Sequence, residues 1–360
     1  MMSSTLHKSD LPADSLDVLR RGAVIPAHLL ALDSARKLDH RRQRALTRYY
    51  LDAGSGGVAV GVHSTQFAIR DAGLYEPVLE LAMQTARDWI PLGGRRPLFM
   101  IGGLAGRTEQ AVRESLIARG LGYHAGLLSL AAMAGASEDA LVAHCRAVAD
   151  VMPLVGFYLQ PAVGGIDLPA SFWARFAAID NVVAIKIAPF NRYRTLDVIR
   201  GVVAARAEES VTLYTGNDDH IVLDLLLPFT VMRDGEPVTV RIGGGLLGHW
   251  SVWTKRAVEL LDRIHAAVAA NAVPPELLAL DAEITDCNGA LFDVAHDFRG
   301  CIAGCHEVLR RQGLLESIAC LDPDEGLSEG QANELDRIAA DYPHLNDDAF
   351  VAEHRARWLE

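Results

Sequence analysis

The sequence LVGFYLQPAVGGIDLPASFWARFAAIDNVVAIKIA, residues 154–188, contains two apolar runs separated by a segment of helix length. The first run covers residues 154–160 and the second covers residues 182–188. Both are continuously apolar rather than alternating, which is typical of parallel strands that are covered on both faces. Two such strands joined through a helix predict a right-handed strand–helix–strand unit of a parallel sheet.

The same pattern extends in both directions, from residue 22 to about residue 250. Further strands are indicated by apolar runs at residues 23–28, 57–63, 97–102, 123–130, 211–216 and 239–243. In one of the amphipathic stretches between them, Ser137 precedes two acidic residues and is expected to cap a helix. Eight strands alternating with helices predict an α/β protein with a (β/α)8 TIM barrel. A doubly wound open sheet is the rival, but the segment after the first strand lacks its phosphate-binding glycines.

The chain is expected to have three parts. Residues 1–21 are predicted to form an N-terminal helical segment, residues 22–250 the barrel, and residues 251–360 a C-terminal helical extension. Within the extension, helical patterns separated by Gly and Pro turn signals cover residues 253–270, 283–294, 299–312 and 329–342.

Composition excludes several classes of protein. The 360 residues include 34 basic and 46 acidic side chains, for a net charge of −12, which argues against a nucleic-acid partner. No signal peptide and no uncharged span of about 20 residues are visible, so we expect a cytoplasmic protein that does not enter the membrane. The five cysteines do not form a disulfide pattern. No cofactor and no metal are expected, because Cys301 and Cys305 lack a second ligand pair at zinc spacing.

Lys186 is the most informative residue, because its strand, VVAIKIA, carries no other charge. The sequence has four lysines among its 34 basic residues, so a lysine in an apolar strand is unusual here. Burial lowers the pKa of an ammonium group, and a neutral lysine amine can form a Schiff base with a keto acid. The alternative is a lysine at a strand end whose ammonium reaches solvent or pairs with a carboxylate.

Tyr158 lies near the end of the preceding strand, one strand–helix–strand step before Lys186. Because the ends of adjacent parallel strands meet, we expect the phenol beside the amine, where it can carry protons during imine chemistry. The alternative is a core tyrosine with a satisfied hydroxyl.

Other residues follow the remaining strands and are expected at the same face of the barrel. His63 and His28 could bind substrate or carry a proton, or could be packed polar residues. The pair Asp218–Asp219 could bind a metal or could be a helix cap. Gly216 and Gly244 are expected to leave room for substrate.

Several of these residues together resemble a known family. Tyr158, Pro161 and Lys186, with GVHSTQF at residues 61–67 and TGNDD at residues 215–219, are similar to the dihydrodipicolinate synthase / N-acetylneuraminate lyase superfamily. The resemblance covers residues 22 to about 250.

The resemblance implies a TIM barrel in which Lys186 forms the Schiff base with pyruvate or another 2-keto acid. It implies that Tyr158 moves protons and that Ser64 and Thr65 bind the carboxylate of the substrate with hydroxyl and N–H groups. It also implies a homodimer or homotetramer.

Three positions depart from the pattern of that superfamily. Leu159 stands where asparagine is usual, Leu130–Ala132 lacks the tyrosine that reaches a neighbouring subunit, and Ala162–Gly165 lacks an arginine for a second substrate. The main hypothesis is therefore a class I, metal-independent lyase, either an aldolase or a hydro-lyase. The alternatives are dihydrodipicolinate synthase itself and a non-catalytic keto-acid-binding homologue. With the relay tyrosine absent, His63 next to Ser64 is the expected proton acceptor.

Overall fold

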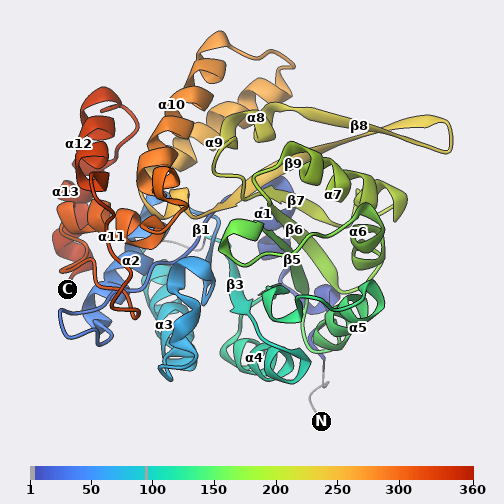
Figure 1. Ribbon diagram of the computed structural model, residues 1–360, viewed down its shortest axis with the longest axis horizontal. Helices are drawn as coiled ribbons and strands as arrows, with labels where there is room; N and C mark the ends of the chain where they lie inside the picture. The colour runs from blue at the N-terminus through green and yellow to red at the C-terminus, as the bar shows by residue number, and fades with distance from the viewer. Residues whose placement is uncertain (1–4, 94–95) are drawn as a thin grey trace.

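The computed structural model describes residues 5–93 and 96–360, and within them eight parallel strands form a barrel surrounded by helices (Figure 1). The strand order is β1-β9-β7-β6-β5-β4-β3-β2, and a parallel bridge between Ala27 and Ala59 joins the two ends. The predicted (β/α)8 barrel with C-terminal helices is confirmed. The strands are β1 (Val24–Pro26), β2 (Gly57–Val60), β3 (Phe99–Leu104), β4 (Ala125–Leu128), β5 (Leu154–Leu159), β6 (Val182–Ala188), β7 (Thr212–Thr215) and β9 (Glu236–Leu247).

Helices cover the outside of the barrel and continue after it. Ser137 caps one of them as expected, because its side chain accepts a hydrogen bond from the N–H of Ala140. The helices are α1 (Ala13–Arg21), α2 (His40–Ala53), α3 (Tyr75–Gly93), α4 (Thr108–Leu121), α5 (Glu138–Ala149), α6 (Ala170–Ala177), α7 (Arg192–Ala204), α8 (Ile221–Leu226), α9 (Thr254–Ala269), α10 (Pro275–Leu291), α11 (Cys301–Arg311), α12 (Gln331–Asp341) and α13 (Asp348–Trp358).

The strands separate two apolar cores. One core fills the barrel and includes Phe99, Ile101 and Phe157, and the other lies between the strands and the outer helices. Helix α1 closes the N-terminal end of the barrel. There Leu19 joins the inner core, and its carbonyl accepts a hydrogen bond from the hydroxyl of Tyr214. The opposite end therefore remains as the mouth of the barrel.

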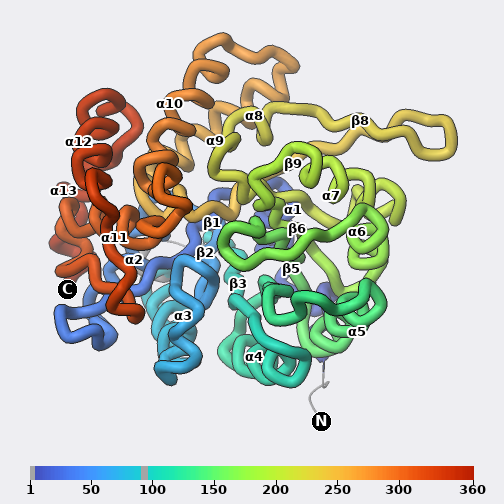
Figure 2. Tube along the Cα trace, in the orientation of Figure 1, coloured from blue at the N-terminus to red at the C-terminus, as the bar shows by residue number. Residues whose placement is uncertain are grey.

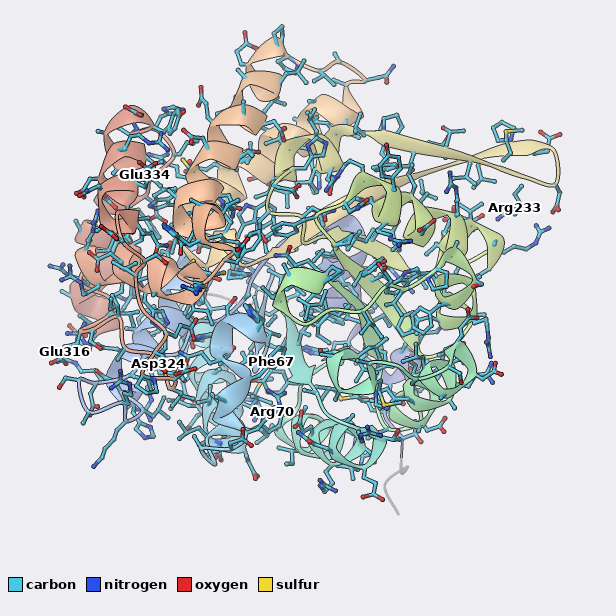
Figure 3. All side chains as sticks on the ribbon, in the orientation of Figure 1. Phe67, Arg70, Arg233, Glu316, Asp324 and Glu334 are labelled. Atoms are coloured by element: carbon cyan, nitrogen blue, oxygen red, sulfur yellow. The ribbon has the colours of Figure 1, made fainter. Side chains whose placement is uncertain are left out.

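A hairpin interrupts the regular repeat between β7 and β9. Strand β8 (Pro228–Arg233) pairs antiparallel with the first half of β9 and projects from the barrel (Figure 1). The turn is Asp234–Gly235, with φ angles of 53° and 87°, the backbone that Asp-Gly turns favour. Arg233 beside this turn forms an ion pair with Glu208 (Figure 3). The predicted strand at 239–243 is thus the middle of a longer strand.

The C-terminal helices fold back on the early part of the chain. Helix α10 begins at Pro275 rather than at residue 283, because proline is well suited to the first position of a helix. Helix α13, which the sequence patterns did not indicate, packs against α2 (Figure 2). There the indole N–H of Trp358 donates to Asp52 at 2.7 Å. Among the described residues, no helix is both long enough and apolar enough to cross a membrane.

Candidate active site

Lys186 lies on β6 with its side chain inside the barrel. It is 7% exposed, and its ammonium lies 4.5 Å from the centre of the Phe157 ring. Gly216 makes room for it, because a Cβ at Gly216 would lie 2.5 Å from Cε of Lys186. Burial lowers the pKa of Lys186, and the nearby carboxylate of Asp218 raises it in part. The amine is therefore closer to its neutral, nucleophilic form than an ordinary lysine.

A pocket at the mouth of the barrel contains this lysine. Its volume is about 50 Å³, which is room for roughly four water molecules. Its polar side chains are His63, Ser64, Gln160, Lys186, Asp218 and Cys301. Its apolar side chains include Phe157, Leu159, Val163, Phe190, Phe292 and Phe298.

Asp218 provides a buried carboxyl group in this pocket. It is 4% exposed, and its Oδ1 accepts a hydrogen bond from the backbone N–H of His249 at 2.9 Å. Burial raises the pKa of Asp218, whereas the His249 hydrogen bond and the charge of Lys186 lower it. The sequence pattern suggested a metal ligand or a helix cap at this position. The prediction of a helix cap at Asp218 is wrong, because His220 rather than Asp218 precedes α8.

The neighbours of Asp218 have structural partners. Asn217 is buried, accepts a hydrogen bond from the N–H of Phe190, and donates to Thr195 and Asp224. Asp219 is more exposed and pairs with a nearby arginine. These contacts brace the loops after β6 and β7 against each other and leave Asp218 directed at the pocket.

The loop after β2 brings two of the predicted residues to the pocket. His63 and Ser64 line it, but Thr65 does not. The Thr65 hydroxyl accepts from the N–H of Gly61 at 2.9 Å and donates to the carbonyl of His28 at 2.7 Å. The expectation that Thr65 binds the substrate carboxylate is therefore wrong, because its hydroxyl is used within the backbone turn.

Arg70 holds this loop in place. Its guanidinium pairs with the buried Glu114 at 2.9 Å, donates to the carbonyls of Gly61 and Gly103, and lies beside the ring of Phe67 (Figure 3). Because arginine offers donors in a fixed fork, one side chain can join the ends of β2 and β3.

His63 is neutral in this environment. Burial, helped by the charge of Lys186, lowers the pKa of His63 to about 4. The sequence predicted an ordinary imidazole that titrates near neutrality, but the pKa of His63 lies below that range. A neutral imidazole can still donate and accept hydrogen bonds.

The structure does not bring Tyr158 to Lys186. Tyr158 belongs to the outer core, lies 5.4 Å from the Trp173 ring, and accepts a hydrogen bond from the N–H of Leu168. A register shift after Leu154 pairs Phe157, not Tyr158, with Lys186. One residue of shift exchanges the two faces of a strand. The predicted pairing of Tyr158 with Lys186 is therefore wrong, and Phe157 occupies the expected place of the phenol.

Two other predicted residues also lie away from the pocket. Gly244 packs in β9 against Ala23 and Tyr214, where a Cβ would lie 2.5 to 2.7 Å from them, so it allows close strand packing rather than substrate entry. His28 is fully buried, with ring nitrogens at hydrogen-bond distance from Leu29 and Thr47. His28 is thus the packed polar residue that the sequence left as an alternative.

Aromatic side chains form the outer wall of the pocket. Phe292 and Phe298 come from the segment between α10 and α11, and Phe190 comes from the loop after β6. The sequence gave no local signal for this wall, because its members are far apart in the chain. Phe190 and Phe298 have φ angles of 50° and 66°, which cost bulky residues of order 1–3 kcal/mol each.

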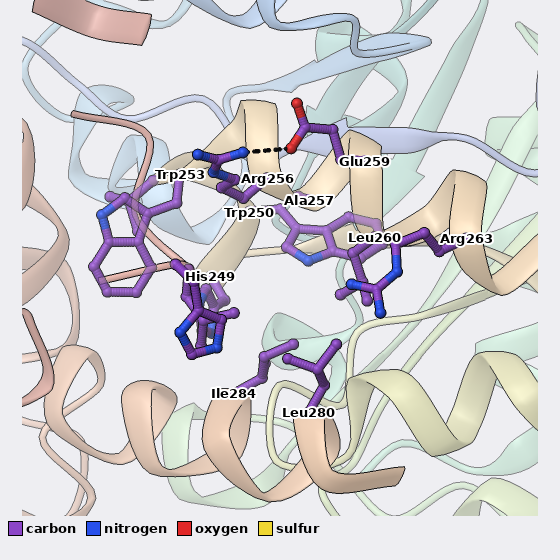
Figure 4. A pocket seen from close by; sticks show the side chains of 13 residues that line it. His249, Trp250, Trp253, Arg256, Ala257, Glu259, Leu260, Arg263, Leu280 and Ile284 are labelled. Carbon is purple, nitrogen blue, oxygen red and sulfur yellow. Dashed lines mark hydrogen bonds and ion pairs between the residues drawn. The ribbon is translucent and has the colours of Figure 1, made fainter. Parts of the chain in front are cut away.

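A second cavity of about 210 Å³ lies between α9 and α10 (Figure 4). Trp250, Trp253 and Ile284 contribute apolar walls, and Arg256 at its edge pairs with Glu259. The ring of His249 lines this cavity, whereas its backbone N–H reaches Asp218. This cavity does not include Lys186. Because the reactive amine lies in the pocket at the barrel mouth, that pocket is the candidate active site.

The fold and the buried strand lysine define the class of (β/α)8 barrels that form Schiff bases. The model of the dihydrodipicolinate synthetase family matches residues 20–229. This match covers more than half of the chain, so the chain belongs to that family, a family of Schiff-base lyases.

Known relatives agree with this assignment. A 4-hydroxy-tetrahydrodipicolinate synthase of Desulforudis audaxviator is 26% identical over 251 residues, which cover 69% of this chain and 80% of that enzyme. An N-acetylneuraminate lyase of Citrobacter koseri is 26% identical over 206 residues, covering 56% of this chain and 65% of the lyase. A further synthase, from Nitrosospira multiformis, is 25% identical over 192 residues, covering 53% of this chain and 60% of its own length.

Solved structures share the fold. The dihydrodipicolinate synthase of Acinetobacter baumannii complexed with pyruvate has a TM-score of 0.71 at 18% identity, covering 89% of this chain and 99% of its own. CdNal from Clostridium difficile in complex with mannosamine has a TM-score of 0.71 at 13% identity, with the same coverage of both chains. At such identities the likeness concerns the fold alone.

Proposed function

We propose that the protein is a class I aldolase that cleaves or forms a carbon–carbon bond next to a 2-keto acid bound to Lys186. The observation that carries the proposal is the buried amine of Lys186 in a pocket that also holds the buried carboxyl group of Asp218. A desolvated amine attacks a ketone, and the resulting protonated imine accepts the electron pair of the breaking bond. This chemistry needs neither a metal nor a cofactor.

In the cleavage direction, the substrate is a 4-hydroxy-2-keto acid. The Lys186 amine adds to C2, and loss of water gives the protonated imine. The C3–C4 bond then breaks, its electrons enter the imine, and the C4 hydroxyl loses its proton as the aldehyde leaves. Protonation of the enamine at C3 and hydrolysis of the imine release the keto acid and restore the amine.

Asp218 is the proposed proton acceptor for the C4 hydroxyl. It faces the pocket, its orientation is fixed by the N–H of His249, and its raised pKa suits proton exchange near neutrality. In this proposal Asp218 carries out the proton transfer for which the sequence predicted Tyr158, with His63 as the final proton acceptor. Its signal in the sequence was an acid directly after an apolar strand of a barrel, at the active-site face.

Ser64 and His63 are proposed to bind the carboxylate and neighbouring oxygen atoms of the keto acid. Ser64 offers a hydroxyl at the pocket wall, and the neutral ring of His63 offers one donor. Gly216 keeps the floor of the pocket open beside Lys186. We further propose that the protein is cytoplasmic and forms a homodimer or homotetramer. Sedimentation of the purified protein would check the oligomeric state.

Trapping of the imine tests the proposal. Incubation with pyruvate and borohydride should add one reduced pyruvyl group to the protein, measured by intact mass and placed on Lys186 by peptide mapping. Lys186→Ala should abolish both the adduct and turnover, since no other group supplies the electron-accepting imine. Lys37→Ala, at an exposed lysine, is the matched control and should keep both. An unmodified wild-type protein with pyruvate and a series of larger 2-keto acids would overturn the proposal and favour a non-catalytic homologue.

A further inference from the structure

The part of the pocket farthest from the barrel interior is built by residues outside the strands. Phe190 follows β6, whereas Phe292, Phe298 and Cys301 belong to the segment from the end of α10 to the start of α11. The rings of Phe190 and Phe298 meet edge to face, with centroids 5.9 Å apart and planes at 76°. These rings therefore line the same pocket as the Lys186 amine.

The backbone holds both rings in conformations that phenylalanine rarely adopts. Phe190 and Phe298 both have positive φ, and each N–H is fixed by an acceptor, Asn217 Oδ1 for Phe190 and the carbonyl of Asp293 for Phe298. The buried carboxylate of Asp293 also accepts from Gly300 N–H and from the Ser328 hydroxyl. Such over-determined strain is found where the position of a side chain serves a function.

The charges in the pocket limit what this wall can bind. In the described part of the chain, the charged side chains that line the pocket are Lys186 and Asp218, and the proposed chemistry uses both. Among the residues that the structure describes, no arginine lines the pocket to pair with a second carboxylate. Hydroxyl groups of a sugar-like substituent that lay against these aromatic rings would have no hydrogen-bond partner there, and buried polar groups without partners weaken binding.

We infer that the enzyme is selective for 4-hydroxy-2-keto acids whose leaving aldehyde carries an uncharged apolar group, aromatic or branched aliphatic, that packs against the contacting rings of Phe190 and Phe298. The inference rests on the proposed function. The C3–C4 bond breaks, its electron pair passes into the imine on Lys186, and the hydroxyl proton passes to Asp218. The products are the apolar aldehyde and pyruvate, so the reaction needs no oxidant or reductant.

The condensation direction gives a direct test with defined probes. Wild-type protein and pyruvate are combined with benzaldehyde, isovaleraldehyde, erythrose or succinic semialdehyde, and product formation is followed by mass spectrometry. We expect kcat/KM for the two apolar aldehydes to exceed that for erythrose and for succinic semialdehyde by roughly 10- to 100-fold.

Phe298→Asn separates selectivity from stability. Asparagine tolerates positive φ, so the variant relieves backbone strain while it removes the ring. Its thermal stability should be retained and a pyruvate adduct at Lys186 should still form, while its preference for apolar aldehydes over erythrose should fall by roughly tenfold. Phe298→Leu should keep most of the preference because it keeps apolar volume. Phe229→Ala, on the hairpin away from the pocket, is the control.

The outcomes distinguish the two proposals. A wild-type protein that forms the pyruvate adduct but uses erythrose or succinic semialdehyde as well as benzaldehyde overturns the inference and leaves the Schiff-base function intact. So does Phe298→Asn with unchanged selectivity. Absence of every keto-acid adduct overturns the function and the inference together.

Discussion

The barrel and the C-terminal helices contribute different things to one pocket. The barrel supplies the amine of Lys186, the carboxyl group of Asp218 and the hydroxyl of Ser64, whereas the segment after α10 supplies Phe292 and Phe298. The family match ends at residue 229, so it covers the chemical groups and none of the C-terminal rings. On the two proposals above, the barrel carries the reaction type, whereas substrate choice depends on Phe190 of the barrel together with rings from the segment after α10.

After Lys186→Ala, the largest effect should come from Asp218→Asn, on the barrel side. Turnover should fall by roughly 10²- to 10⁴-fold, because the variant loses its proton acceptor, while the imine still forms. Asparagine keeps an oxygen for the N–H of His249, so folding should be retained. The charge of Asp218 raises the pKa of Lys186, and its removal lowers that pKa. The rising limb of the imine-formation rate against pH should therefore move to lower pH, as measured by borohydride trapping.

Two further substitutions serve as controls for the predicted loss of turnover in Asp218→Asn. Asp219→Asn, next in the chain but paired with Arg192 outside the pocket, should keep wild-type turnover. His63→Gln should lose less than about tenfold, because a histidine with a pKa of about 4 does not carry protons near neutrality. Full turnover in Asp218→Asn combined with a large loss in His63→Gln would return the relay to the histidine.

A pair of glycine substitutions compares the two regions directly. A Cβ at Gly216 would lie 2.5 Å from Lys186, and a Cβ at Gly248 would lie 2.7 Å from the ring of Phe292. Gly216→Ala should slow imine formation by roughly 10²-fold, because it displaces the amine. Gly248→Ala should leave the imine rate within about threefold and cost roughly 1–3 kcal/mol in stability, as overpacking does. Stopped-flow trapping and thermal unfolding measure the two effects. Equal imine-formation rates in the two variants would contradict the separate roles proposed for the barrel and for the segment after α10.

Tyr158→Phe should have only a small effect on turnover. Because the Tyr158 hydroxyl bonds the N–H of Leu168 outside the barrel, its removal should cost about 1 kcal/mol in unfolding free energy and leave turnover within about twofold. Chemical denaturation and steady-state assays measure these quantities. A loss of 10²-fold or more would restore the phenol to the mechanism.

The sequence was sufficient for features that depend on local pattern. Continuous apolar runs located the barrel strands, and the isolated charge in VVAIKIA identified Lys186 as a buried lysine. The β8–β9 hairpin was missed although its signal was present, because Asp234–Gly235 between strand-like residues is a strong turn pattern.

Features that depend on register and long-range contact were not predictable. A uniform register would pair Tyr158 with Lys186, and the irregularity after Leu154 replaces it with Phe157. The use of the Thr65 hydroxyl in a turn and the meeting of Phe190 with Phe298 depend on segments that only the folded chain brings together. These departures concern the side chains around Lys186, which sequence spacing alone does not orient.

The position of the aromatic wall late in the chain sets an order of assembly during synthesis. Segments nearer the N-terminus fold first as a chain is made, so the barrel with Lys186 can form before Phe298 exists. Until the segment with Phe292, Phe298 and Cys301 packs, the mouth of the barrel around the Lys186 amine lacks its outer wall. In the newly made barrel the Lys186 amine would be accessible to any cellular aldehyde or keto acid, whereas in the finished protein the aromatic wall would admit fewer of these compounds. The segment that follows α10 would thus also cover a nucleophile that the chain has already made.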